Sequence, residues 1–241
     1  MPDWPWSRKN SEPSVLLSGR EVPVVIRRLA HARRMTMRLS PDGGQVRLSV
    51  PRWTRQADAL AFVRTQIDWL ETQADAVPER QAPRNGGTIF YLGESHTIAH
   101  DPAMPRRVTV ADGMLRLGGP AETLTPRLRR WLESEARKAC GQDLDHYCSG
   151  AGVLRPRLAL SNAQRRWGSC AADGTIRINW RLIMAPEPVR RSVVAHEVAH
   201  LVHFDHSRDF HMLLKTLFEH DVEASNRWLK TQGRGLYQPF G

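Results

Sequence analysis

The 241-residue sequence predicts an α+β fold, with a β-rich N-terminal half followed by a mainly helical C-terminal half that carries one β-hairpin. Short segments of alternating apolar and polar residues, separated by turns with Gly and Pro, dominate the first half. In the second half, apolar residues recur at spacings of three and four, as they do on the buried face of a helix. Strands and helices that occupy different parts of a chain are typical of α+β proteins.

The β-rich region is expected at residues 14–122, after a loose arm at residues 1–13 that carries three prolines. Its first strands are Val22 to Leu29, Met35 to Leu39 and Val46 to Val50, and Pro41-Asp42-Gly43-Gly44 predicts a hairpin turn between the last two. A helix with Thr54 as its N-cap follows, and its apolar face is formed by Leu60, Val63, Ile67 and Leu70. After a linker, residues 89–117 are again β-rich, with a turn at Asp112-Gly113. No internal repeat is apparent.

The mainly helical region is expected at residues 123–241. A long helix should span residues 125–147, and two strands, at 158–160 and 175–180, should follow it. The next helix opens at Pro186 or Pro188 and reaches about residue 203. Ser207 can cap another helix that runs to about residue 220, and a last helix holds Trp228 and Leu229.

The net charge of +10 comes mainly from arginine, which supplies 31 of the 35 basic residues. Nine arginines lie between Arg20 and Arg55, and eight lie between Arg155 and Arg191. Such clusters can neutralise phosphates, so nucleic acid is a candidate partner. The alternative interpretation is that these arginines are ordinary surface residues that bind no polyanion. No signal peptide or membrane-spanning stretch is apparent, and three cysteines do not form a disulfide framework. These features predict a cytoplasmic protein without a membrane partner, and they leave its oligomeric state open.

The segment His196-Glu197-Val198-Ala199-His200 carries the clearest chemical signal. Two histidines at i and i+4 lie on one face of a helix, so both imidazoles can reach one metal ion. Glu197 points elsewhere and can accept a proton from a metal-bound water. The neighbouring residues are apolar, which predicts a buried helix in which an unpaired His-Glu-His group would be costly.

A catalytic zinc site needs a third protein ligand and one open position. His206 follows His200 by six residues, which is the spacing of the metzincin pattern, although His203 stands where that pattern has glycine. Glu219 is the alternative third ligand, and the spacing favours His206. Cys170 could act as a fourth ligand of a structural site, but tight hairpin packing around Gly168 is the favoured role of this segment.

Several segments together resemble the YgjP-like metallopeptidase family, whose members look like relatives of WLM and SprT-type zinc proteases. They are Arg166-Trp167-Gly168-Ser169-Cys170, Ile178-Asn179-Trp180-Arg181-Leu182, Ala185-Pro186, residues 193–201 and His206-Ser207-Arg208-Asp209-Phe210. Weaker features in the first half, such as Arg33-Arg34-Met35 and Tyr91-Leu92-Gly93, agree with this resemblance. The family usually has Leu at the position of Val198 and Trp at that of His211.

This resemblance implies a zincin-like domain in which His196, His200 and His206 bind Zn²⁺, one per chain, and Glu197 acts as the general base. It also implies that the hairpin at residues 167–170 packs beside the site. The predicted function is a zinc-dependent metallopeptidase that cuts a peptide or protein substrate. Residues that would stabilise the oxyanion are not identified, and Arg165, Arg166, His211 and Tyr237 are the candidates.

Two alternatives remain open at the level of the sequence. The same metal site could hydrolyse a phosphoanhydride bond in a nucleoside triphosphate, which the arginines around the motif would suit. The protein could also be a nucleic-acid-binding module in which the metal is purely structural, and such binding would weaken steeply with salt.

Overall fold

The computed structural model describes residues 13–40, 43–75 and 81–240, and its mixture of helices and small sheets confirms the α+β class. The predicted arm at residues 1–13 lies, except for Pro13, outside the described residues, and so do Pro41 and Asp42 of the predicted hairpin turn. The chain divides into two compact units, residues 1–78 and 79–241.

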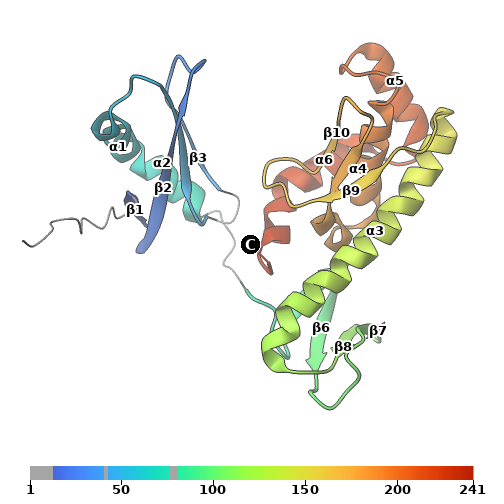
Figure 1. Ribbon diagram of the computed structural model, residues 1–241. Coiled ribbons are helices and arrows are strands. Elements are labelled where there is room, and N and C mark those ends of the chain that lie inside the picture. The colour runs from blue at the N-terminus through green and yellow to red at the C-terminus, as the bar shows by residue number, and fades with distance from the viewer. Residues whose placement is uncertain (1–12, 41–42, 76–80, 241) are drawn as a thin grey trace, which may run out of the picture. The chain divides into compact units, whose positions relative to one another are not determined.

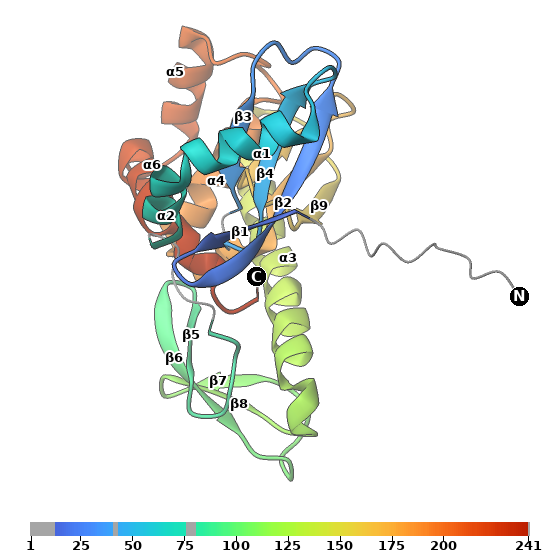
Figure 2. The same ribbon diagram turned by 90° about the vertical axis from the view of Figure 1, so that its left-hand side faces the viewer.

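The first unit consists of a four-stranded sheet and two helices (Figure 1). Its strands are β1 (Ser14–Leu17), β2 (Arg20–Leu29), β3 (Thr36–Leu39) and β4 (Val46–Pro51), in the order β1-β2-β4-β3. The helices α1 (Gln56–Thr65) and α2 (Ile67–Asp75) lie against one face of the sheet (Figure 2). Val24, Val46, Leu48 and Val50 on that face share a buried cluster with Ala59, Val63 and Leu70 of the helices. The alternation seen in the sequence therefore corresponds to a sheet with one covered face.

Two details of the helical expectation in this unit were wrong. Thr54 does not cap α1, because the N-cap position falls on Arg55, which makes no side-chain cap bond. Thr54 belongs to the turn that ends β4, where its backbone N–H donates to Pro51 O at 3.1 Å. The single expected helix is two helices, since Gln66 leaves the helical conformation with φ −115° and ψ 21°. The apolar residues keep their spacing across this break, so periodicity alone did not reveal it.

The second unit begins with another small sheet, which is followed by the longest helix of the described chain. The strands are β5 (Thr88–Tyr91), β6 (Glu94–His100), β7 (Thr109–Ala111) and β8 (Met114–Leu117), in the order β5-β6-β8-β7. After the short 3₁₀ helix η1 (Ala121–Thr123), α3 runs over Leu124–Ala151. Ile89, Ile98, Leu115 and Leu117 share one buried cluster with the apolar face of α3. The ring of Tyr91 also packs on Trp131 of α3, with centroids 4.8 Å apart.

The two four-stranded sheets repeat one another, which corrects the expectation of no internal repeat. Both have the same strand order, with an antiparallel pair, a parallel pair and a second antiparallel pair. Ser18-Gly19 and Leu92-Gly93 form the first turn of each sheet, all four with positive φ. Val24, five residues after Gly19, pairs with Val46, and Ile98, five residues after Gly93, pairs with Leu115. Few side chains are identical between the copies, so the repeat is carried by backbone conformation and burial.

The turn at Leu92-Gly93 contacts the segment that precedes the HExxH helix. The N–H of Leu92 donates to Ile183 O at 2.8 Å. A Cβ on Gly93 would lie 2.8 Å from the Cα of Pro186, so only glycine permits this approach. The compact unit therefore starts at residue 79 and includes residues 88–117, whereas the sequence placed a boundary between residues 122 and 123. The assignment of residues 14–122 and 123–241 as functional domains stays a prediction.

The remainder of the second unit carries the HExxH motif. A three-stranded sheet has the order β10-β11-β9 and consists of β9 (Leu158–Ser161), β10 (Gly168–Cys170) and β11 (Ile176–Asn179). The other elements are η2 (Trp180–Met184), α4 (Glu187–Ala199), α5 (Arg208–Leu217), α6 (Val222–Thr231) and η3 (Gly233–Tyr237). Ser207 caps α5 as expected, because its Oγ accepts from Phe210 N at 3.4 Å. The HExxH helix ends at Ala199, four residues before the expected end, and the chain turns there toward the third histidine.

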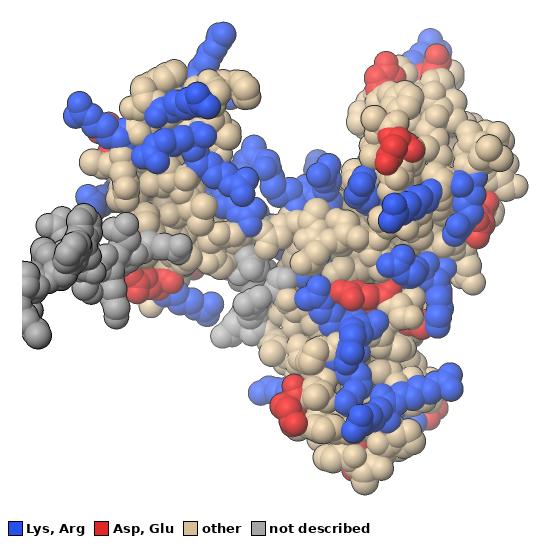
Figure 3. Space-filling model, in the orientation of Figure 1, with Lys and Arg blue, Asp and Glu red and all other residues tan. Residues whose placement is uncertain are grey.

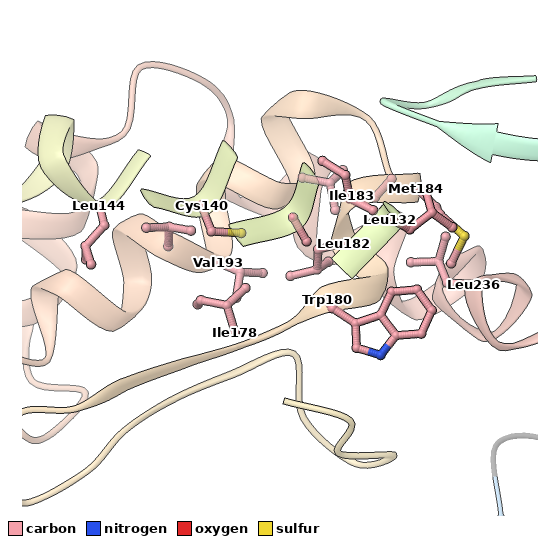
Figure 4. Close-up of a cluster of buried hydrophobic side chains, with 14 of the residues drawn as sticks. Leu132, Cys140, Leu144, Ile178, Trp180, Leu182, Ile183, Met184, Val193 and Leu236 are labelled. Carbon is pink, nitrogen blue, oxygen red and sulfur yellow. The ribbon is translucent and has the colours of Figure 1, made fainter. Parts of the chain in front are cut away.

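Helix α4 packs against α3 through apolar side chains and one buried ion pair. Figure 4 shows Cys140 and Leu144 of α3 in the same cluster as Ile178 of β11 and Val193 of α4. Nε of Arg190 in α4 lies 2.8 Å from Oδ2 of Asp143 in α3, and both side chains are only 5% exposed. This pair therefore fixes the first half of the HExxH helix to the longest helix of the unit.

Basic side chains are spread over the visible face of each unit and outnumber the acidic ones there (Figure 3). In the first unit, the nine arginines from Arg20 to Arg55 lie on the strands, on their connections and at the start of α1, and four of the five described carboxylates lie on α1 and α2. Binding of nucleic acid to these arginines stays a prediction. Among the described residues, no helix is both long enough and apolar enough to cross a membrane.

Removal of the buried Asp143 carboxylate should strongly destabilise the second unit. Asp143→Ala leaves the buried Arg190 guanidinium with only the exposed carboxylate of Glu187, at 3.8 Å, as an ion-pair partner. Loss of the buried partner costs about 3–5 kcal/mol of unfolding free energy. Urea denaturation followed by tryptophan fluorescence measures this change. The matched control is Asp145→Ala, which removes the exposed ion pair with Arg155 and should cost less than about 1 kcal/mol. Equal losses in the two variants would contradict the role given to the buried pair.

Candidate metal centre

Three imidazoles converge at the C-terminal end of α4. Nε2 of His196 lies 3.2 Å from Nε2 of His200 and 3.2 Å from Nε2 of His206. His196 lies in α4, His200 is the residue at its C-cap, and His206 comes from the turn before α5. One ring nitrogen from each of the three histidines lies within 4.8 Å of the other two. The structure thus brings together the three histidines that the sequence singled out.

Local contacts orient these rings. Nδ1 of His200 lies 3.0 Å from the carbonyl oxygen of His203, and since a carbonyl only accepts, Nδ1 carries the proton. Nε2 of His200 therefore presents its lone pair to the centre of the cluster. The buried ring of Phe210 packs against all three imidazoles, with centroid distances of 5.0, 4.5 and 4.9 Å. Phe210 thus forms one wall of the cluster and restricts how the rings can rotate.

The electrostatic environment keeps His196 neutral. Burial and, to a smaller extent, the positive charges that His200, His206 and His211 can carry lower the pKa of His196 to about 4. A neutral imidazole has a free lone pair, which is the form that binds a metal.

The histidine cluster fits a divalent metal such as zinc. In a tetrahedral zinc site each imidazole nitrogen lies about 2.0–2.1 Å from the metal, so two such nitrogens are roughly 3.3 Å apart. The two distances of 3.2 Å agree with this value. Lone pairs that face one another at this distance repel unless a cation or a proton lies between them. His206 is exposed, so the cluster opens toward solvent, as a catalytic site requires.

Glu197 is held in a separate, largely buried environment beside the histidines. The pKa of Glu197 is raised to about 7, because burial outweighs the opposing effects of a hydrogen bond from the backbone N–H of Cys170 and of the charge of Arg166. Gly168 makes room for this carboxylate, because a Cβ at that position would lie 2.4 Å from Oε1 of Glu197. Strand β10 therefore packs directly on the glutamate, as the sequence had suggested for the Gly168 segment.

Glu219, the alternative third ligand, interacts with Tyr147 and Arg191 instead of with the histidines. Tyr147 donates a hydrogen bond to Oε2 of Glu219 at 2.9 Å, and Arg191 forms an ion pair with the other carboxylate oxygen. The cluster of potential ligands in the described chain contains His206 and not Glu219. Cys170 is likewise absent from that cluster, and its Sγ lies 3.7 Å from Ala171 O.

The four candidates for oxyanion stabilisation differ in their surroundings. Tyr237 is buried and its hydroxyl donates to Ala163 O at 2.9 Å and accepts from Asn179 at 3.2 Å, so it anchors the C-terminal segment. His211 is exposed on α5, with its ring 6.3 Å from that of His206. Arg166 is close enough for its charge to lower the pKa of Glu197.

A pocket of about 210 Å³ opens beside His196 and Glu197. One of its walls comes from α6, through Val222, Asn226 and Leu229. Sequence reasoning missed these residues, because α6 carried only the signal of an ordinary amphipathic helix. Phe210 was quoted in a motif, but its packing on the histidines needed the three-dimensional arrangement.

A comparison with known protein families matches most of the chain to a metallopeptidase domain. The family model described as YgjP-like, metallopeptidase domain, matches residues 34–232. Among solved structures, the crystal structure of the metallopeptidase zymogen of Pyrococcus abyssi abylysin is similar to this chain at 20% sequence identity, with a TM-score of 0.36. That similarity covers 39% of this chain and 96% of the abylysin chain. No curated protein matches the sequence.

Metal analysis of the purified protein should find about one zinc per chain. His196→Ala, His200→Ala and His206→Ala should each lose the metal, because each removes one of three converging nitrogens. Glu219→Ala should retain it, as should His220→Ala, which serves as a control histidine. Mass spectrometry of the metal content measures these outcomes. Zinc retained by His206→Ala but lost by Glu219→Ala would instead indicate a site with two histidines and a glutamate.

Proposed function

Because the chain belongs to the YgjP-like metallopeptidase family, we propose that it is a zinc-dependent peptidase in which His196, His200 and His206 bind the metal and Glu197 is the general base. The observation that carries this proposal is the position of Glu197. Its carboxylate is largely buried, and it lines the same pocket as His196. Zinc is the metal that three imidazoles and an open position favour.

The residues divide the chemistry between them. When bound, the metal would polarise the peptide carbonyl and acidify a water molecule at the site. The Glu197 carboxylate takes the proton of the attacking water and passes it to the nitrogen of the leaving amine. A base whose pKa lies near neutrality is suited to both steps, since it can accept and then release the proton. Phe210 and the carbonyl of His203 hold the imidazoles in place during this exchange.

The pocket favours a peptide over a nucleoside triphosphate. A triphosphate carries several negative charges, which proteins bind with Arg, Lys or backbone N–H groups. None of the described residues that line the pocket is an arginine or a lysine, and Glu197 adds negative charge. Arg190 and Arg191 are engaged in ion pairs with Asp143 and Glu219. Arg166, whose charge acts on Glu197, is not among the residues that line the pocket. These contacts support peptide hydrolysis as the reaction.

Glu197→Gln should abolish most peptide hydrolysis without loss of the metal. Removal of a general base lowers kcat by about 10²- to 10⁴-fold. Burial raises the pKa of Glu197 above the ordinary pKa of a glutamate. Ionisation of this carboxylate therefore lowers the stability of the fold as the pH rises from that ordinary pKa toward 7. The neutral amide should therefore leave the Tm unchanged or higher. Assays of a mixed peptide substrate, metal content and thermal unfolding measure the three effects.

The same preparation should be offered ATP and UTP as alternative substrates. Triphosphate hydrolysis that is lost in Glu197→Gln, with no peptide cleavage by the wild type, would overturn the assignment as a peptidase. Peptide cleavage at an unchanged rate in the variant would instead remove Glu197 from the mechanism.

Gly168→Ala should impair the same reaction through the position of Glu197. The added methyl group would lie 2.4 Å from Oε1, so the carboxylate must shift. A displacement of about 1 Å at a reacting group can cost roughly 100-fold in rate. Metal content should stay at the wild-type level, because the three atoms nearest to the added methyl group all belong to Glu197 and none to a histidine. Gly174→Ala, in the loop after β10, is the control. A Cβ at Gly174 would have its nearest neighbour 4.0 Å away, so this variant adds only the backbone strain of a positive φ.

A further inference from the structure

The pocket beside Glu197 has walls from three elements of the second unit. Helix α4 provides Ser192, Val193, His196 and Glu197, the β10 segment provides Trp167 and Gly168, and α6 provides Val222, Asn226 and Leu229. A group bound in this pocket would therefore lie against the proposed general base and one proposed metal ligand.

The α6 wall is a single helix face whose position is fixed by the core. Val222, Asn226 and Leu229 are spaced by four and three residues, so they lie on one side of the helix. Val222 and Leu229 are partly buried and pack against the main apolar cluster of the unit. Asn226 is exposed, which places its amide at the solvent side of the pocket. The inner part of this wall is therefore aliphatic.

The wall formed by Trp167 is also packed against the core, and the hydroxyl of Ser192 in α4 is already hydrogen-bonded. The ring of Trp167 packs on Tyr237 with centroids 5.6 Å apart, and a Cβ on Gly233 would lie 2.8 Å from Cζ2 of Trp167. The hydroxyl of Ser192 donates to Val189 O at 2.8 Å, so its proton is used within α4. A ligand in the pocket thus meets the Trp167 ring and the aliphatic side chains of Val193, Val222 and Leu229, beside the polar groups of His196, Glu197 and Asn226.

The volume of the pocket sets the size of the group it can hold. An apolar cavity of about 150 Å³ binds a benzene molecule, so a volume of 210 Å³ has room for a leucine, methionine or phenylalanine side chain. We propose that this pocket binds an apolar side chain of that size, from the substrate residue adjoining the cleaved bond, and that Leu229 and Val222 set its upper limit. The inference rests on the proposed peptidase function.

Charged side chains should be poor occupants. An acidic side chain would face the Glu197 carboxylate at close range and be repelled. A lysine or arginine side chain would lose water of hydration among Val193, Val222 and Leu229, which is costly for an isolated charge. If such a cation paired with Glu197, it would also occupy the base that the reaction needs. The apolar preference therefore follows from both the walls and the chemistry.

Cleavage-site mapping on a library of peptides with all residue types tests the preference. The zinc-loaded wild-type protein should cut with Leu, Met or Phe enriched at one position next to the cleaved bond. Leu229→Ala should shift the preference toward Phe and Trp, and Leu229→Phe should shift it toward Ala and Val, each by about tenfold or more in relative kcat/KM. Lys230→Ala, at the exposed neighbour of Leu229 on α6, should leave the cleavage pattern unchanged.

Binding of N-acetyl-leucinamide and N-acetyl-lysinamide to the zinc-loaded Glu197→Gln variant gives a readout that does not depend on turnover. The leucine derivative should bind at least tenfold more tightly, and the added substitution Leu229→Phe should abolish this difference. Cleavage without an apolar preference, or with a preference that Leu229 variants do not alter, overturns the pocket assignment and leaves the peptidase in place. Absence of any cleavage with selective leucinamide binding overturns the peptidase function while the pocket stands. Equal binding of the two amides overturns the pocket assignment.

Discussion

Burial of α4 is the constraint on which the rest of the second unit depends. Nine residues of this helix are buried, including Glu197, so the HExxH motif is part of the core as well as of the site. The Asp143–Arg190 pair and the apolar contacts with α3 hold the first half of the helix, and Phe210 and β10 pack around the second half. Since these contacts leave the imidazoles little freedom to move, the cluster is formed by the same packing that stabilises the fold.

The parts of the site that could be predicted from sequence are those encoded by local spacing. His196 and His200 are one helical turn apart, and Ser207 caps the following helix, so their arrangement depends on residues within a few positions of one another. The prediction that His206 lies close to the other two histidines depended on the conformation of the turn between two helices. Because α4 ends early, at Ala199, that turn is longer than expected. The choice between His206 and Glu219 rested on motif spacing alone. Spacing could not indicate that Tyr147 and Arg191, which are distant in sequence, bind the Glu219 carboxylate.

Long-range arrangements could not be predicted. The pocket wall on α6 follows from how that helix packs on α4, and nothing in the sequence of α6 distinguishes Leu229 from an ordinary core leucine. The repeat of the two four-stranded sheets was missed for a related reason. Its signature is two turns with positive φ and a shared pairing register, and side chains such as Val22 and His96 occupy matching buried positions with different chemistry. The α+β class itself depended only on periodicity, and it was confirmed.

The shared core of α3 has a consequence for anyone who wishes to produce the protein in pieces. A fragment that begins at residue 123 keeps all three histidines and Glu197, yet it lacks the sheet that packs on Trp131 and shares a cluster with the apolar face of α3. Exposed apolar surface of this kind promotes aggregation. It would also lack the Leu92–Ile183 and Gly93–Pro186 contacts at the start of α4. An insoluble fragment would therefore reflect the missing part of the core, contributed by residues 88–117, rather than a defect in the catalytic motif.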